Sequence, residues 1–291
     1  MASTLQLVRK WKLRPSKRMG QNFLSDPQAA KKIVRQSGVS AGDTVLEIGP
    51  GLGALTIPLS ETAETVYAVE KDKRVVPILE DELLALGITN ASVIEGDILD
   101  FDIADLSKKE NRDIIVMGNL PYNISSQVLV KLIESRRVIP HAVLMFQKEL
   151  AERITARPGC RDYGRLSVML GYCAEIETLA QMKSSQFYPR PEVDSTVLKI
   201  IFRNRFENRA EREAFLFRVI KAAFGKRRKT LRNSLAGHWP SIDAKKAGEC
   251  LENVGIDPTR RAETLSVSEF VKLSNELIEA VDPHAKDNIN P

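Results

Sequence analysis

The stretch TVLEIGPGLG, residues 44–53, decides the fold, because a short apolar run passes directly into a glycine-rich turn. A run of this length bounded by glycine predicts a buried strand. Glycines at the turn from a strand into a helix let the backbone approach a ligand closely. A sulfonium-bearing cofactor would suit this turn. Gly49, Gly51 and Ala54 also fit the G-x-G-x-x-G/A fingerprint of dinucleotide sites, and a tight turn without a ligand is a third interpretation.

The same alternation of strand and helix continues to about residue 202. Apolar runs predict further strands at residues 65–70, 91–96, 113–119, 141–147, 174–182 and 195–202. Helical spacing predicts helices near residues 54–60, 73–86, 125–135 and 148–156. Short apolar strands separated by helices favour parallel pairing with helices on both faces. We therefore predict an α/β fold with a doubly wound, mostly parallel, Rossmann-like sheet and an antiparallel edge at its end.

Length and composition exclude several classes of protein. The 291 residues are 43% hydrophobic and carry 43 Lys and Arg against 38 Asp and Glu, a formal net charge of +5. This apolar content excludes wholesale disorder. No apolar run approaches the roughly 20 residues that span a bilayer, and the N-terminus lacks the apolar core of a secretory signal. We therefore expect a cytoplasmic protein without a membrane partner.

Cysteine and histidine are too sparse for metal chemistry. The chain has three residues of each type, and their scattered positions suit neither a disulfide framework nor a zinc site. No histidine lies beside a plausible ligand partner. We therefore expect no metal and no histidine-based catalysis.

The chain changes character after residue 203. The polar stretch NRFENRAERE follows the last predicted strand, and beyond it apolar residues recur at helical spacing with no strand signal. We predict a basic N-terminal arm over residues 1–20 and a methyltransferase-like sheet domain over 21–205. A small all-α domain over 206–283 and a frayed tail over 284–291 would follow.

The positive charge is clustered rather than spread. Residues 9–18 (RKWKLRPSKR) hold six basic residues and residues 226–232 (KRRKTLR) hold five, with no acid in either. One such cluster alone is as often a solvated face as a binding site. Two of them in a nearly balanced chain favour a polyanionic partner. The predicted RNA-binding residues are Arg14, Lys17, Arg18, Lys226, Arg227, Arg228, Lys229 and Arg232.

Acidic residues end the next two predicted strands. Glu70 closes the second strand, where a carboxylate can accept hydrogen bonds from both hydroxyls of a ribose. Asp97 follows the third strand and could accept from the exocyclic amine of adenine, with Ile98 packed on the base. Both features suit S-adenosylmethionine as well as a nicotinamide dinucleotide, and each alone could be an ordinary strand end. Together they lie on one carboxyl edge, where open α/β sheets bind ligands.

The fourth strand ends in the most informative tetrapeptide, Asn119-Leu120-Pro121-Tyr122. It suggests methylation of an exocyclic amine, whose lone pair is delocalised into the ring. The Asn119 side-chain oxygen and the Leu120 carbonyl could accept hydrogen bonds from the two N–H groups. Pro121 would hold the turn rigid and Tyr122 would stack on an extruded base. The plain alternative is a proline-containing turn after a strand.

Long motifs narrow this interpretation. The tetrapeptide resembles the catalytic motif of adenine-N6 methyltransferases. The chain resembles the ribosomal RNA adenine dimethyltransferase family over nearly its whole length, on five stretches: QNFL (21–24), NLPYNIS (119–125), FYPRPEVDS (187–195), AAFGKRRKTLRNSL (222–235) and RAETLSVSEF (261–270). The resemblance implies an enzyme that transfers methyl groups from S-adenosylmethionine to N6 of two adjacent adenosines near the 3′ end of 16S rRNA, in the small (30S) ribosomal subunit or its precursor. It also implies a role in subunit biogenesis.

The resemblance also implies roles for single residues. It puts the cofactor site on Asn22, Leu24, Gly49, Glu70, Asp97 and Asn119. Phe187 would pack on the target base opposite Tyr122, unless it is simply a core aromatic. The alternatives are a 23S rRNA adenine methyltransferase of the same fold, a non-catalytic assembly factor, and a nicotinamide-dependent dehydrogenase. The last leaves the tetrapeptide unexplained.

Overall fold

The computed structural model describes residues 3–203, 209–226 and 228–281, with the side chain of Lys17 left out. Arg227, the predicted domain boundary near residue 205 and the predicted tail over 284–291 lie outside the described residues. The chain forms two compact units, Met1–Ala151 with Ala174–Phe202, and Glu152–Cys173 with Arg203–Pro291. This division differs from the predicted domains in one respect, because residues 152–173 group with the C-terminal part of the chain.

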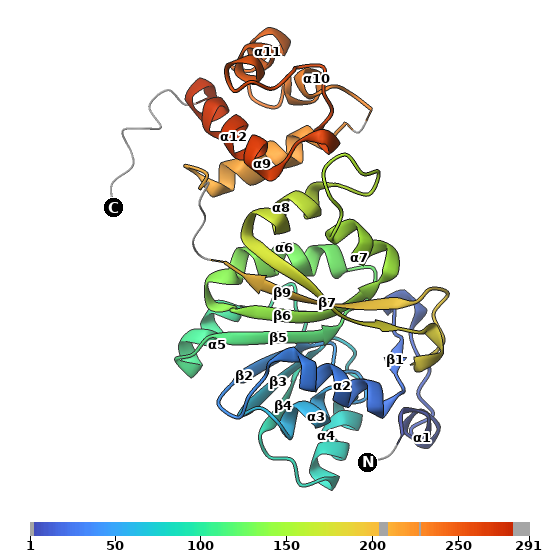
Figure 1. Ribbon diagram of the computed structural model, residues 1–291. Helices are drawn as coiled ribbons and strands as arrows, with labels where there is room; N and C mark the ends of the chain where they lie inside the picture. Colours follow the sequence, from blue (N-terminus) through green and yellow to red (C-terminus); the bar gives the residue numbers. More distant parts are fainter. Residues whose placement is uncertain (1–2, 204–208, 227, 282–291) are drawn as a thin grey trace. The chain divides into compact units, whose positions relative to one another are not determined.

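A seven-stranded sheet forms the centre of the first unit, counted over the described residues (Figure 1). Along the sheet its strands are β4 (Ala91–Glu95), β3 (Thr65–Glu70), β2 (Thr44–Ile48), β5 (Ile114–Asn119), β6 (His141–Gln147), β9 (Ser195–Phe202) and β7 (Ala174–Met182). The first five strands pair in parallel, whereas β9 is antiparallel to both of its neighbours. The predicted α/β class and its antiparallel edge are therefore confirmed.

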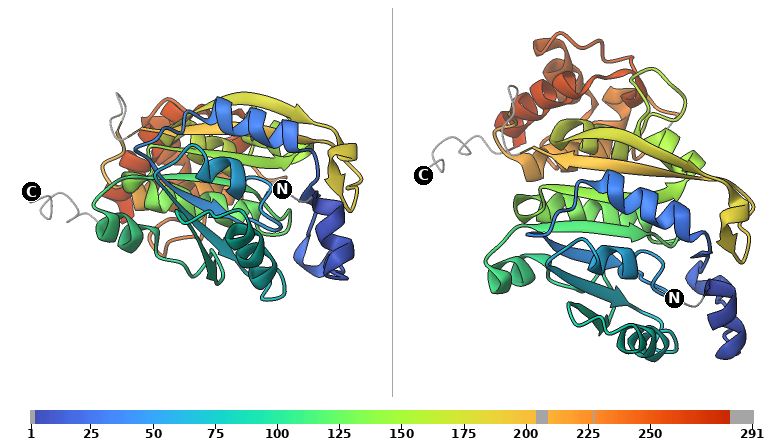
Figure 2. Two further views of the ribbon diagram at one scale, coloured as in Figure 1. Left: turned by 90° about the horizontal axis from the view of Figure 1, so that it is seen from below. Right: turned by 60° about the horizontal axis from the view of Figure 1, so that its bottom comes forward.

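Apolar side chains are buried on both faces of the sheet, as a parallel sheet requires. All five residues of β2 are buried. Val45 packs in a cluster with side chains of α2 (Pro27–Ser37) and α3 (Thr56–Ser60), while Leu46 points to the opposite face and is equally buried. Figure 2 shows α2 lying across one face of the sheet. Helices α4 (Val76–Ala85), α5 (Ile103–Glu110) and α6 (Ser125–Ser135) join the later strands of this unit.

The strand order fixes where a ligand can bind. From β2 the chain adds β3 and β4 on one side, and then returns to add β5 and β6 on the other. The loops after β2 and β5 therefore diverge, and they leave a crevice at the carboxyl ends of these strands.

The N-terminal segment has more structure than its charge indicates. Residues Thr4–Lys10 form helix α1, capped by the Ser3 side chain. The two-residue strand β1 (Phe23–Leu24) then pairs antiparallel with β8 (Phe187–Tyr188). Apolar side chains of α1 pack with Phe23 and with residues of α4. The arm is thus attached to the sheet domain near the crevice.

The second unit is helical over its described residues. Its main helices are α8 (Arg165–Cys173), α9 (Glu213–Ala223), α10 (Leu231–Leu235), α11 (Ala244–Asn253) and α12 (Val267–Val281). Phe224 stacks on Phe270 at 5.9 Å between ring centroids, and Tyr163 meets Phe224 edge-on at 6.3 Å. Across both units, the described part of the chain has no helix whose length and apolar character suit a membrane span.

Candidate active site

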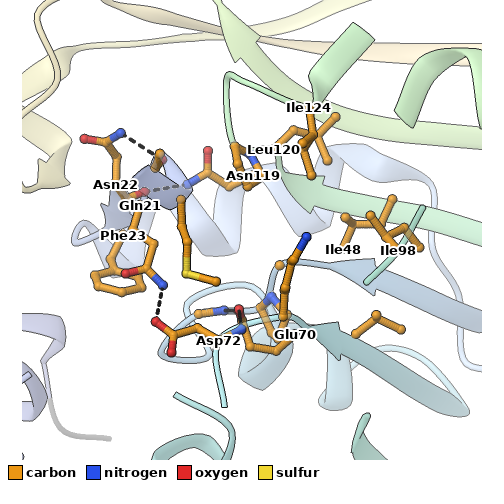
Figure 3. Close-up of a pocket in the computed structure, with 18 of the residues that line it drawn as sticks. Gln21, Asn22, Phe23, Ile48, Glu70, Asp72, Ile98, Asn119, Leu120 and Ile124 are labelled. Carbon is orange, nitrogen blue, oxygen red and sulfur yellow. Dashed lines mark hydrogen bonds between the residues drawn. The ribbon is translucent and has the colours of Figure 1, made fainter. Parts of the chain in front are cut away.

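A cavity of about 650 Å³ opens at the carboxyl ends of β2, β3, β4 and β5 (Figure 3). Its walls come from the turns after these strands and from residues 16–24 of the N-terminal segment. Its volume is in the range of small-molecule sites. All the residues predicted to bind the cofactor line it: Asn22, Leu24, Gly49, Gly51, Glu70, Asp97, Ile98 and Asn119.

The glycine turn is shaped by close contacts. Gly51 has φ +55°, and a Cβ atom there would lie 2.8 Å from Cδ1 of Phe23. Its N–H donates to Oε2 of Glu70 at 3.2 Å. A larger side chain would both strain the backbone and collide with the Phe23 ring. Gly51 therefore lets the N-terminal segment lie directly against the turn.

Glu70 is a buried acceptor at the end of β3. It is 8% exposed, and burial raises the pKa of its carboxyl group. Backbone N–H groups of Gly51 and Asp72 each donate to one of its oxygens. A carboxylate has about four acceptor positions, so both oxygens keep a free lone pair for donors inside the cavity.

Asp97 follows β4 and is held by its neighbours. Partial burial acts to raise the pKa of its carboxyl group, but hydrogen bonds from Lys71 and from the Leu99 N–H outweigh burial and lower it. Lys71 donates to Oδ2 and Leu99 to Oδ1. Ile98 beside it is buried and apolar. The pair therefore combines a charged acceptor with an apolar surface, as an adenine ring with its amine requires.

Asn119 ends β5, and one hydrogen bond fixes its orientation. Its Nδ2 donates to the main-chain oxygen of Asn22 at 2.8 Å, as the dashed line in Figure 3 marks. A carbonyl oxygen can only accept, so the amide must present its NH₂ group to Asn22. The acceptor Oδ1 is then left for a ligand.

The rest of the tetrapeptide forms a fixed loop, which we call the catalytic loop (residues 119–125). Ser125 Oγ and the Ile124 N–H both donate to the Pro121 carbonyl, at 2.9 and 3.2 Å. Leu120, Pro121 and Tyr122 line the cavity. The Tyr122 hydroxyl lies 3.4 Å from Ser195 Oγ, and burial raises the pKa of this phenol. These contacts hold the loop in one shape before any ligand enters.

Residues 13–279 match the family described as ribosomal RNA adenine dimethylase. The chain belongs to this family. A ribosomal RNA small subunit methyltransferase A from Desulforapulum autotrophicum is 55% identical and is aligned over 93% of this chain and 95% of its own. The protein of the same name from Bacillus cereus is 38% identical, over 94% of this chain and 95% of its own.

Two solved structures are similar as well. A dimethyladenosine transferase from Plasmodium falciparum has a TM-score of 0.71 at 27% identity, and the match covers 86% of this chain and 95% of that one. The 23S rRNA methyltransferase ErmE has a TM-score of 0.64 at 25% identity, with 88% and 99% covered. As a member of the ribosomal RNA adenine dimethylase family, the chain is an S-adenosylmethionine-dependent enzyme that N6,N6-dimethylates adenosines of 16S rRNA.

Glu47 is a cavity residue of this dimethylase that the sequence did not single out. It lies inside β2, is 1% exposed, and its Oε2 atom has no hydrogen-bond partner among the described residues. Burial raises the pKa of this carboxyl group to about 8. A buried, unpaired acceptor is costly unless a ligand supplies a donor or a cation. The ammonium and sulfonium groups of S-adenosylmethionine are suitable partners, so the cavity fits this cofactor.

A second group of unexpected cavity residues joins the N-terminal segment to the turn after β3. Gln21, Asp72 and Arg74 line the cavity and bond to one another. Gln21 lies in a motif that the sequence analysis quoted, but nothing in the sequence links it to Asp72, 51 positions away. An acid inside the buried run TVLEIG is, by contrast, a signal that could have identified Glu47.

Phe187 does not lie where the sequence analysis expected it. The side chain is 4% exposed and packs in the apolar cluster around α2, and it is not among the residues that line the cavity. Pairing of β8 with β1 sets Phe187 opposite Leu24 and turns its ring into the core. The geometry therefore corresponds to the core-aromatic alternative, and it does not bring Phe187 to Tyr122.

The predicted RNA-binding residues are exposed wherever their side chains are described. In the first unit Arg14 and Arg18 are exposed, and Arg18 also lines the cavity. The exposed basic residues of the second unit are Lys226, Arg228, Lys229 and Arg232. Among the residues with described positions, no group of three or more His, Cys, Asp or Glu side chains could hold a metal ion.

Proposed function

We propose that the cavity holds S-adenosylmethionine beside an extruded adenine, and that the enzyme dimethylates N6 of two adjacent adenosines near the 3′ end of 16S rRNA. The observation that carries this assignment is the Asn119–Asn22 hydrogen bond, which leaves Oδ1 of Asn119 as an acceptor at the cavity wall. An acceptor in this place can receive an amine N–H and favour the pyramidal nitrogen that attacks a methyl group.

Each part of the cofactor has a complementary residue. Glu70 would accept from the ribose hydroxyls, because both of its oxygens retain acceptor capacity. Asp97 and Ile98 would hold the adenine of the cofactor. Gly49 and Gly51 would give close backbone approach, with Asn22 and Leu24 covering the opposite side. When bound, S-adenosylmethionine supplies an electrophilic methyl group on sulfur.

The target adenine would be held by the catalytic loop. Oδ1 of Asn119 and the Leu120 carbonyl would accept from the two amine N–H groups, and the Tyr122 ring would stack on the base, at about 1–3 kcal/mol. Extrusion of the base costs a few kcal/mol, which stacking and hydrogen bonding offset. No strong base is needed, because the amine becomes acidic only after it receives the methyl group. Positioning and fixed dipoles would supply most of the acceleration.

The substrate would be rRNA within the 30S subunit or its precursor, bound by exposed basic residues. Relatives named small subunit methyltransferases favour this partner over 23S rRNA. We expect the enzyme to act in the cytoplasm, where this particle is assembled, to contribute to subunit biogenesis, and to need no metal.

The decisive experiment is transfer of labelled methyl groups to 30S particles from a strain that lacks the modification, followed by nucleoside analysis. We expect N6,N6-dimethyladenosine and a primer-extension stop near the 3′ end of 16S rRNA. Labelling confined to 23S rRNA would reject the proposed substrate. Cofactor binding without any transfer would instead favour a non-catalytic assembly factor.

A further inference from the structure

We propose that Gln21, Asp72 and Arg74 are positioning residues that orient the Asn119 amide by holding the turn over residues 20–22 against the catalytic loop. The inference deepens the proposed function and rests on it, because it assigns a task to side chains that need not touch either substrate. We call these three residues the positioning network.

The network starts from a forked ion pair. Arg74 donates from Nε to Oδ1 of Asp72 at 2.9 Å and from Nη2 to Oδ2 at 2.6 Å. Asp72 is 4% exposed, and the hydrogen bonds from Arg74 lower the pKa of its carboxyl group to about 2. The carboxylate is therefore charged at any physiological pH, and its fork geometry is one that a lysine could not reproduce.

Gln21 connects this pair to the N-terminal segment. Its Nε2 donates to Oδ2 of Asp72 at 2.8 Å, and its Oε1 accepts from the Ser16 N–H at 2.7 Å. Both ends of the amide are therefore used, one on each of two chain segments. Arg74 adds a long contact from Nη1 to the Arg14 carbonyl at 3.5 Å. Gln21 is thus fixed between the turn after β3 and the arm.

The neighbour of Gln21 carries the link to the catalytic amide. The Asn22 carbonyl receives Nδ2 of Asn119, while the Asn22 side chain donates to the Gly20 carbonyl at 3.2 Å. Figure 3 shows the bonds from Gln21 to Asp72 and from Asn119 to Asn22 side by side. A hydrogen-bonded path therefore runs from Arg74 through Asp72 and Gln21 to the residue that orients Asn119.

The same turn lies against the catalytic loop. A Cβ atom at Gly20 would lie 3.2 Å from Oδ1 of Asn123 and 3.5 Å from the Tyr122 nitrogen. A shift of the turn would therefore disturb both the loop backbone and the Asn22 carbonyl. The terminal torsion of an asparagine is soft, so without this carbonyl the Asn119 amide can turn its NH₂ group toward the amine. Two donors would then face each other.

The test separates positioning from cofactor contact. Asp72→Asn, Gln21→Ala and Arg74→Ala are compared with Glu80→Gln, a matched loss of an exposed carboxylate on α4. Methyl transfer to undermethylated 30S particles is measured in a single turnover at saturating S-adenosylmethionine, and cofactor affinity is measured by calorimetry. We expect the transfer rate to fall about 10- to 100-fold, since small misplacements at a reacting centre have costs of this size. Cofactor Kd should change by less than about threefold.

Two further measurements complete the test. Gln21→Ala combined with Arg74→Ala should lose little more than either alone, because both act through one carbonyl. The side-chain amide signal of Asn119, identified by its absence in Asn119→Ala, should shift or broaden in Gln21→Ala. Wild-type transfer rates in all three variants, or a weaker cofactor Kd with an unchanged rate, would overturn the proposal. Failure of the wild-type enzyme to methylate the particle would instead reject the proposed function.

Discussion

The cavity wall and the basic clusters are built in opposite ways. At the wall, Asn119, Glu70 and Asp97 each have hydrogen-bond partners that fix their acceptor atoms. In the basic clusters, Arg18 and Arg228 are exposed side chains. Buried, directed groups suit a reaction that depends on orientation, whereas exposed charge suits contact with many phosphates. The contrast predicts that wall variants change the rate of methyl transfer and cluster variants change particle binding and its salt dependence.

The largest effect is expected at Asn119. Asn119→Ala removes the acceptor for the amine, and loss of one such group typically lowers a rate by about 10²- to 10³-fold. Cofactor affinity should fall less steeply, because Glu70 and Asp97 remain. Single-turnover transfer to undermethylated 30S particles and calorimetry with S-adenosylmethionine give the two values. Full activity of this variant would break the contrast at its most important point.

Glu47 tests how strongly the wall depends on burial. Its pKa of about 8 in the folded protein lies above the ordinary 4.5. The folded state therefore binds a proton more tightly, and the stability due to the protonated group is lost as pH rises from about 4.5 through 8. In the protein without cofactor, Glu47→Gln should remove this loss and raise the free energy of unfolding at pH 8 by up to a few kcal/mol.

The measurement for Glu47 is urea unfolding at pH 5 and pH 8. Glu80→Gln serves as control, because it removes an exposed carboxylate from the same unit. A difference between wild type and Glu47→Gln that stays the same at both pH values would show that burial does not control this carboxyl group.

Gly51 tests the close packing of the N-terminal segment on the glycine turn. Gly51→Ala must accept φ +55° and a Cβ atom 2.8 Å from the Phe23 ring. We expect a loss of about 1–3 kcal/mol in unfolding free energy and weaker cofactor binding. Gly87→Ala is a matched control, because Gly87 has φ +68° with no atom within 4 Å of the added Cβ. Equal losses in the two variants would assign the effect to backbone strain alone.

The sequence predicts local patterns of this fold better than contacts between distant segments. Apolar runs located every strand of the large sheet, and the acid that ends β3 indeed lines the cavity. Helix α8 was missed because its apolar run passes without a break into β7, and α1 because its segment was interpreted by charge. The position of Phe187 depends on β1–β8 pairing across more than 160 residues. No local pattern encodes that pairing.

The active site divides in the same way. A strand-end glutamate has a recognisable position relative to its own turn, so Glu70 could be predicted. The role of Gln21 depends on a carboxylate in another turn, and side-chain identity alone does not reveal that partner. Burial likewise decides that Glu47 lacks a hydrogen-bond partner for one oxygen. Groups that act through a distant partner thus need the structure.

The smallest effect on the rate is expected in the basic clusters. Replacing Arg228, Lys229 and Arg232 together with Ala should weaken particle binding without changing the single-turnover rate at saturating substrate. Each lost phosphate contact releases fewer counterions, so the slope of log K against log salt should become shallower by roughly 0.7–0.9 per contact. Lys272→Ala, an exposed lysine on α12, is the control for loss of charge in the same unit. An unchanged slope in the triple variant would reduce this cluster to a solvated face, and a lower saturated rate would show that the clusters contribute to orientation as the wall does.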